Sequence, residues 1–202
     1  MDAPRLAMRG IGKAFPGVQA LADVDLEVRG GEVVGLVGEN GAGKSTLLKI
    51  LGGVHRADRG GIELDGVPIA LASPRAARAA GIATIHQELS LCDNLTVEAA
   101  LFLGDELRRG PFLRRAAMRD ETRRWCERLG LVVDPDTRVA DLRPGAQQLL
   151  EIARALATDP KLLLLDEPTA GMNPQETRQA EELIFKIRDL GLAVLVIEHD
   201  MR

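Results

Sequence analysis

The residues best suited to chemistry form a glycine-rich segment that ends in a lysine and a serine. From Gly38 to Ser45 the chain reads Gly-Glu-Asn-Gly-Ala-Gly-Lys-Ser, which matches the phosphate-binding pattern G-x-x-x-x-G-K-S/T at every fixed position. Glycines let the backbone wrap closely around phosphate oxygens, so that several N–H groups point at the anion. Lys44 is expected to reach the β- and γ-phosphates, and the Ser45 hydroxyl to bind Mg²⁺. The segment predicts a site for a nucleoside triphosphate with its magnesium ion.

The sequence on both sides of this loop suits the same interpretation. Residues 33–37 are apolar and β-prone, and after Ser45 apolar side chains recur at helical spacing. A strand before the loop and a helix after it separate a phosphate loop from a chance match, and the positive end of that helix attracts anions. A glycine-rich turn with Lys44 as a solvated cap is the weaker alternative. The residues expected around the phosphates are Gly38, Glu39, Asn40, Gly41, Ala42, Gly43, Lys44, Ser45 and Thr46.

Two carboxylates follow a run of four leucines at residues 162–165. A carboxylate that emerges from a buried strand is unfavourable unless something pairs with it. Magnesium bound to phosphate is the obvious partner, so Asp166 is expected to hold Mg²⁺ through water. Glu167 is placed to orient or deprotonate the attacking water. Asp166 as a helix N-cap before Pro168 is the alternative, which the phosphate loop makes less favourable.

The remaining pattern predicts an α/β fold. Residues 3–31 suit β-hairpins, and Ile62-Glu63-Leu64 before Asp65-Gly66 is a strand followed by a turn. Residues 95–158 read as helical, with Pro144 opening the last helix, and 177–190 form an amphipathic helix. Apolar strands at 33–37, 82–85, 162–165 and 193–197, separated by helices, predict a parallel sheet covered on both faces. Ligands of such sheets bind at the carboxyl ends of the strands, where Lys44, Asp166 and Glu167 fall.

The arginine-rich stretch from 108 to 124 is interpreted as the solvated face of a helix. Its buried stripe is expected to consist of Met118, Thr122, Trp125 and Leu129.

Composition narrows the classes of function. A length of 202 residues suits one domain, and the net charge of −4 argues against nucleic-acid binding by bulk electrostatics. Cys92 and Cys126 are too few and too dispersed for a disulfide framework or a zinc site. No signal peptide is expected, and no apolar run approaches the roughly 20 residues needed to cross a bilayer. Work at a membrane would therefore need a partner instead of direct insertion.

Together, the motifs resemble an ABC-transporter ATPase over essentially the whole chain. The phosphate loop, Gln87 after a strand, a helix-opening glycine stretch, Leu-Leu-Leu-Leu-Asp-Glu-Pro-Thr and Glu-His-Asp stand in that family's order. The resemblance implies ATP and Mg²⁺ as cofactors, with adenine stacked on Phe15. It implies that Gln87 senses Mg²⁺ and water, that His199 contacts the γ-phosphate, and that Glu167, His199 and Gln87 are catalytic. Gly145, in the signature-loop position, is implied to bind ATP held by the opposite subunit.

The same resemblance implies the partners and the location. It implies a P-loop NTPase of the ABC ATPase type, with an antiparallel N-terminal β-subdomain and a helical subdomain. Two such ATPases, as a homodimer or a pseudo-dimer, would power solute import through a transmembrane permease at the cytoplasmic face of the membrane. Residues 11–104 resemble monosaccharide importers, whereas residues 166–201 resemble branched-chain amino-acid importers. The long coiled-coil insertions of the DNA-repair and chromosome-organising ATPases that share this fold are not seen in the chain.

Two departures from the family pattern shape the expectations. The signature loop usually reads Leu-Ser-Gly-Gly-Gln, but here Arg143, Pro144 and Ala146 flank Gly145. Losing one preorganised donor costs about two or three powers of ten in rate, so a dimerising nucleotide switch with little hydrolysis is the alternative function.

The expected organisation is one domain over 1–202, with 1–90 and 159–202 as the nucleotide core and 91–158 helical. Because family members continue beyond residue 202, an uncovered sheet edge and reduced stability are expected.

Overall fold

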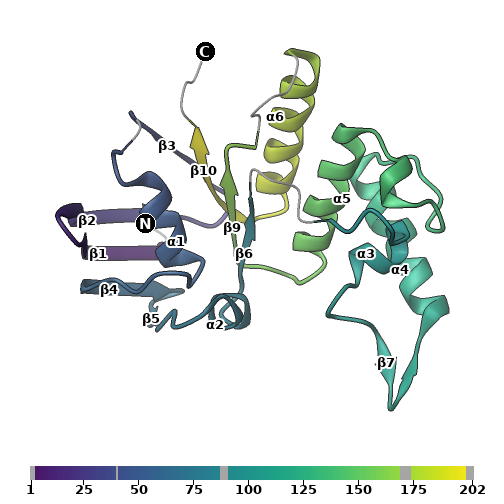
Figure 1. Ribbon diagram of the computed structural model, residues 1–202, viewed down its shortest axis with the longest axis horizontal. Helices are drawn as coiled ribbons and strands as arrows, with labels where there is room; N and C mark the ends of the chain where they lie inside the picture. The colour runs from purple at the N-terminus through teal and green to yellow at the C-terminus, as the bar shows by residue number, and fades with distance from the viewer. Residues whose placement is uncertain (1–2, 40, 87–90, 169–173, 199–202) are drawn as a thin grey trace. The chain divides into compact units, whose positions relative to one another are not determined.

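The structure is a computed structural model of the chain, and it describes all residues except 1–2, 40, 87–90, 169–173 and 199–202 (Figure 1). The chain forms two compact units. One comprises residues 1–87 and 159–202, and the other comprises residues 88–158.

The first unit begins with an antiparallel sheet. Its strands lie in the order β2-β1-β4-β5, with bounds β1 Leu6–Phe15, β2 Val18–Val28, β4 Arg59–Leu64 and β5 Val67–Pro68. The predicted turn after β4 is formed by Asp65 and Gly66, whose φ angles are 52° and 72°. Two consecutive positive φ values are what the twist of a two-residue hairpin requires, and Asp-Gly supplies them with little strain. The predicted antiparallel β-subdomain is confirmed.

A parallel sheet forms the centre of the same unit. Its order is β3-β10-β9-β6, and every pair is parallel. The bounds are β3 Val33–Val37, β6 Ile82–Ile85, β9 Leu162–Asp166 and β10 Ala193–Glu198. The leucines of β9 and the apolar residues of β10 are buried, as expected for central strands of a parallel sheet whose two faces are both covered. The predicted parallel α/β sheet is confirmed.

Three helices accompany this sheet in the described part of the first unit: α1 Lys44–Leu51, α2 Pro74–Ala79 and α6 Pro174–Asp189. The four apolar side chains of α1 are at most 4% exposed, and they join the core that β1, β9 and β10 share. Helix α6 begins three residues before the predicted start, because proline is well suited to the first position of a helix.

The second unit is mostly helical. Its elements are α3 Val97–Leu101, β7 Arg108–Arg109, β8 Phe112–Leu113, α4 Arg115–Leu129, the 3₁₀ turn η1 Val139–Asp141 and α5 Pro144–Leu156. Helix α5 opens at Pro144 as predicted. The prediction of a helix across residues 108–114 is wrong, because these residues form the β7–β8 hairpin. Pro111 cannot donate a helical hydrogen bond and would clash with the preceding turn, so α4 begins only at Arg115.

The buried stripe of α4 differs from the predicted one at a single position. Met118, Thr122 and Leu129 are buried as predicted, but Cys126 takes the place of Trp125. Residue 126 follows 118 and 122 in steps of four and therefore stays on their face. Trp125 lies half-buried beside the Arg128 guanidinium, 5.1 Å from the ring centroid. Burial raises the pKa of the Cys126 thiol, which keeps the thiol protonated.

Candidate nucleotide site

The predicted phosphate loop leads directly from β3 into α1. Gly41 and Gly43 both have φ of 88°, and Gly43 is the N-cap of α1. A glycine N-cap offers no side chain to the first turn, and no side chain of the described residues caps the leading N–H groups of α1. These N–H groups and the helix dipole make this end of α1 suited to an anion.

Gly43 is required by close packing as well as by its backbone angle. A Cβ atom at this position would lie 2.6 Å from the carbonyl oxygen of Ala20 and 2.7 Å from a methyl group of Leu21. Strand β2 therefore closes directly against the loop. Only glycine allows this approach together with a left-handed backbone.

The Lys44 side chain folds back over the loop. Its ammonium group donates a hydrogen bond to the carbonyl oxygen of Glu39 at 3.0 Å, and another to the carbonyl oxygen of Gly38. Lys44 is half-buried, whereas Ser45 beside it is exposed. The loop thus positions one cation and one hydroxyl at the start of α1, the two groups that the sequence predicts for phosphate and Mg²⁺.

The carboxylates lie at the matching edge of the parallel sheet. Asp166 is the last residue of β9 and is in register with Ile197, while Glu198 at the end of β10 is in register with Val37. Since Gly38 follows Val37, the ends of β3, β9 and β10 bring the loop and the carboxylates to one edge. Three predicted site residues, Asn40, Gln87 and His199, lie outside the described residues.

Glu167 has a strained backbone. Its φ is 49°, in the left-handed region that non-glycine residues avoid, and its N–H donates to the Ile197 carbonyl oxygen at 3.0 Å. Such strain costs about 1–2 kcal/mol and persists only where surrounding structure enforces it. Strain of this kind clusters at functional sites, and here it falls on the predicted catalytic carboxylate.

A cavity of 230 Å³ adjoins Asp166. It is lined by α1, α2 and β6, and it includes three polar residues that the sequence interpretation did not select, namely Lys49, Thr84 and His86. His86 directly precedes Gln87, so its position after β6 was the signal that could have identified it.

Phe15 lies at the end of β1, 36% exposed, and is held by groups from the loop after α1. The His55 ring meets it edge-on, with centroids 5.3 Å apart. Asp58 accepts hydrogen bonds from the Lys13 ammonium and the Ala14 N–H, both at 2.8 Å. The hydrogen bond from Lys13 is the main cause that lowers the pKa of Asp58. These contacts could not be predicted from local sequence patterns, because 45 residues separate Lys13 from Asp58.

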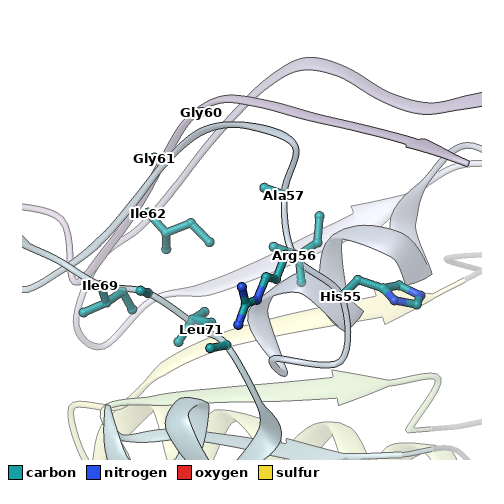
Figure 2. A pocket seen from close by; sticks show the side chains of 11 residues that line it. His55, Arg56, Ala57, Gly60, Gly61, Ile62, Ile69 and Leu71 are labelled. Atoms are coloured by element: carbon teal, nitrogen blue, oxygen red, sulfur yellow. The ribbon is translucent and has the colours of Figure 1, made fainter.

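A larger cavity of 390 Å³ lies between β4, residues 69–72 after β5 and the loop after α1. None of the predicted site residues lines it. In Figure 2 the Arg56 guanidinium points into this cavity, whereas the His55 ring points away from it.

Gly145 belongs to the second unit, in the first turn of α5. Arg143 is the N-cap of that helix, with extended backbone, an exposed side chain and no side-chain hydrogen bond to the helix end. A Cβ atom on Gly145 would meet no atom within 4 Å, so its surroundings are open. Pro144 carries no N–H, and the N–H groups of Ala146 and Gln147 donate to the Arg143 carbonyl oxygen at 2.9 and 3.0 Å, so the Gly145 N–H is the donor that this end of α5 offers.

The donor set fits magnesium better than a metal held by protein alone. Within the part of the chain that the structure describes, no three His, Cys, Asp or Glu side chains gather as a metal site. Mg²⁺ usually keeps several waters and binds one or two carboxylates together with substrate phosphates, and Asp166 and the Ser45 hydroxyl are the two groups that could supply the protein's share. Separately, no described helix has the length and apolar character needed to cross a membrane.

Comparisons with known proteins point to one family. The ABC transporter family matches residues 21–170. The ribose import ATP-binding protein RbsA of Chromobacterium violaceum is 50% identical over 198 residues, covering 98% of this chain and 39% of the relative. RbsA 1 of Rubrobacter xylanophilus is 47% identical over 198 residues, covering 98% and 40%. The chain spans about two fifths of the length of these curated relatives.

Solved structures agree with this match. The ADP conformation of an ATP-binding cassette of an ABC transporter superposes with a TM-score of 0.86 at 27% identity, covering 100% of this chain and 83% of that one. The cbiO1 protein of Clostridium perfringens, part of an ABC transporter complex, gives 0.85 at 26% identity, covering 98% and 80%. The phosphate loop on α1, the carboxylates after β9 and these matches agree, and the chain belongs to the ABC transporter family, with the fold of its ATP-binding cassettes.

Proposed function

We propose that this chain binds ATP with Mg²⁺ and hydrolyses it to power the import of a sugar through a membrane permease. The observation that carries the proposal is the shared sheet edge, at which the loop with Lys44 and the start of α1 follow β3, and Asp166 and Glu167 lie at the end of β9. A cationic loop and two carboxylates at one edge suit a magnesium-bound triphosphate and its hydrolysis. Family membership supports ATP as the nucleotide, and the names of the relatives support import.

Each part of ATP has a proposed contact. The loop from Gly38 to Thr46 would hold the phosphates through its N–H groups, with Lys44 on the β- and γ-phosphates. Ser45, Asp166 and Gln87 would hold Mg²⁺, which neutralises charge on the phosphates when it is bound. Phe15 would stack on adenine, with its ring braced by His55.

Glu167 is the proposed catalytic base. It would take a proton from water as the water oxygen bonds to the γ-phosphorus, while the bond to the bridging oxygen of ADP breaks. The hydrogen bond from its N–H to Ile197 fixes the backbone from which this carboxylate projects. Gln87 and His199 are proposed to orient the water and to contact the γ-phosphate.

The proposed assembly is a pair of cassettes, either two copies or one copy with a second ATPase domain. Gly145 and the open start of α5 would face the γ-phosphate of the ATP held by the opposite cassette. The pair would attach to a permease at the cytoplasmic face of the membrane, with no nucleic-acid partner. The proposed organisation is one domain, with a nucleotide core of residues 1–90 and 159–202 and a helical part of residues 91–158.

A sugar is the preferred solute, because the matched relatives are named for ribose import. Purification with the permease, followed by uptake into vesicles, tests the choice. Uptake of labelled ribose is expected, whereas uptake of labelled leucine without ribose would replace the sugar with a branched-chain amino acid.

A nucleotide switch with little hydrolysis is the second candidate, and Arg143 favours it. An arginine at this N-cap is bulky where a phosphate must approach closely, and it brings no capping hydroxyl. Tight MgATP binding without steady-state phosphate release would support the switch over the ATPase.

Calorimetry and phosphate release test the nucleotide site. Lys44→Ala should weaken MgATP binding roughly 10- to 100-fold, the effect of losing charged hydrogen bonds to phosphate. Lys186→Ala removes an exposed lysine of α6 that lines neither cavity, and this variant should bind MgATP like the parent chain. Glu167→Gln should keep binding but lower turnover by about two to four powers of ten. Equal binding by the parent and Lys44→Ala would overturn the proposed site.

A further inference from the structure

The β7–β8 hairpin of the second unit carries two adjacent apolar side chains that are exposed. Every residue from 108 to 116 is exposed, and Phe112 and Leu113 are 76% and 42% exposed. In Figure 1 the hairpin extends away from α3 and α4. Side chains of this kind are unfavourable in water, so their exposure together at one tip suggests a surface that covers them.

Positive charge concentrates at the same place. Residues 107–119 contain five arginines and no Asp or Glu, in a chain whose net charge is −4. Arg109, Arg114 and Arg115 form no side-chain hydrogen bond or ion pair with any residue that the structure describes. Further along α4, by contrast, Arg119 pairs with Asp136, and Arg124 pairs with Glu121 at 3.1 Å. On the hairpin itself Arg108 pairs with Glu106 at 3.1 Å, so the uncompensated charge is that of Arg109 on the hairpin and of Arg114 and Arg115 at the start of α4.

The pairing of β7 with β8 places arginine side chains next to apolar side chains. Arg109 is opposite Phe112, and Arg108 is opposite Leu113. Opposite residues of an antiparallel pair project from the same face, so each face of the hairpin carries one arginine and one apolar side chain. The hydrogen bond from Arg114 N–H to the Leu107 carbonyl oxygen, 2.8 Å long, closes the hairpin where it joins α4.

We propose that this hairpin, with Arg114 and Arg115, docks onto a membrane surface that contains anionic lipids. A hairpin tip inserted between lipid headgroups has the same surroundings on every face. This suits the β7–β8 hairpin, because each of its two faces carries one arginine and one apolar side chain. Phe112 and Leu113 would reach the boundary of the acyl chains, while the arginines stay among the phosphates. An acidic protein would neutralise the arginines, but it would contact one face and leave the apolar side chain of the other in water.

Docking of this kind goes beyond the proposed ATPase function and does not depend on it. One short hairpin provides a weak and reversible attachment, so it would assist a permease in keeping the cassette at the membrane. The attachment should be sensitive to salt, because exposed charges are screened within a few ångströms at high ionic strength.

Vesicle flotation with the purified full chain tests the proposal. Vesicles of phosphatidylcholine with 30% phosphatidylglycerol, in about 50 mM salt, should bind the chain, whereas pure phosphatidylcholine or about 500 mM salt should not. Replacing Arg109, Arg114 and Arg115 with Gln should weaken binding about a hundredfold, from about fivefold per arginine. Phe112→Ser should weaken it roughly tenfold. The matched control replaces Arg123, Arg124 and Arg128, three exposed arginines of α4, with Gln and should bind within a few-fold of the parent.

Three results would overturn the proposal: no binding of the parent chain to anionic vesicles, parent-like binding by the hairpin variant, or equal loss in the control variant. Binding to poly-glutamate but not to vesicles would replace the membrane with an acidic protein. Calorimetry with MgATP on the same variants should give the parent affinity. That readout keeps a failure of docking distinct from a failure of the nucleotide site.

Discussion

The N–H of Glu167 donates a hydrogen bond to the carbonyl oxygen of Ile197 at 3.0 Å, and this bond ties the proposed catalytic carboxylate to the neighbouring strand. Glu167 follows β9, whereas Ile197 belongs to β10. The bond extends the ladder between these strands by one step beyond Asp166, and the chain then leaves the sheet with a φ of 49°. The position of the carboxylate is thus a property of two strands that lie far apart in the sequence.

Glu167→Gly should be more stable than Glu167→Ala by about 1 kcal/mol, because alanine keeps the strain of a left-handed backbone and glycine does not. Urea unfolding of the two variants at pH 7 measures the difference. An alanine variant as stable as the glycine variant would mean that the backbone at this position is not left-handed in solution.

Gly43→Ala should destabilise the protein by about 2–4 kcal/mol and prevent normal nucleotide binding. The new methyl group would collide with Ala20 and Leu21, and overpacking adds to the strain of a positive φ. Thermal melts and MgATP calorimetry are the measurements. Gly61→Ala is the control, since its Cβ meets nothing within 4 Å, and it should melt like the parent. Unchanged stability of Gly43→Ala would contradict the observed contact between β2 and the loop.

Arg143→Ser should stabilise the protein by about 0.5–2 kcal/mol. Arg143 has the extended backbone of an N-cap but offers no acceptor, whereas a serine hydroxyl can accept from the first turn of α5. Comparison with Arg143→Ala, which cannot cap, isolates the hydrogen bond from the loss of charge. Denaturant unfolding that ranks serine no higher than alanine would count against the cap.

Asp65→Asn should lower the free energy of unfolding by about 0.5 kcal/mol at pH 7. This value is small because Asp65 is partly exposed to solvent, which screens its ion pairs. At pH 2 the substitution should change the free energy of unfolding by almost nothing. Asp65 accepts from Lys161 at 2.7 Å and from Arg5 at 2.8 Å, and the hydrogen bond from Lys161 is the main cause that lowers its pKa. A carboxyl with a lowered pKa contributes stability above its unfolded value near 4, and this is lost as pH falls through the folded pKa.

Urea titrations of both chains at the two pH values check this dependence. Asparagine is a suitable replacement because it tolerates the positive φ of the turn at residue 65. A deficit of equal size at pH 2 would show that the turn, and not the ion pairs, accounts for the loss.

Local pattern was enough to predict the strands at 33–37 and 82–85 with the bounds that the structure shows. Their apolar runs have few alternatives once helices flank them. The predicted helix was wrong at residues 108–114, because the prediction relied on the high arginine content of this stretch, which was interpreted as the solvated face of a helix. Gly110 and Pro111 interrupt that stretch, and turn chemistry of this kind overrides composition.

The sequence by itself determined the phosphate loop, the order of strands and helices, and the carboxylates after β9, because backbone dihedral preferences and apolar spacing are local. Only the tertiary structure decided what holds these residues in place: Ala20 against Gly43, His55 beside Phe15, and Ile197 bonded to Glu167. Such pairs are separated by 23 to 40 residues or so, and hydrophobic periodicity carries no information about which distant segments will meet. Their contacts exist because burying the shared core of β1, α1, β9 and β10 brings the segments together.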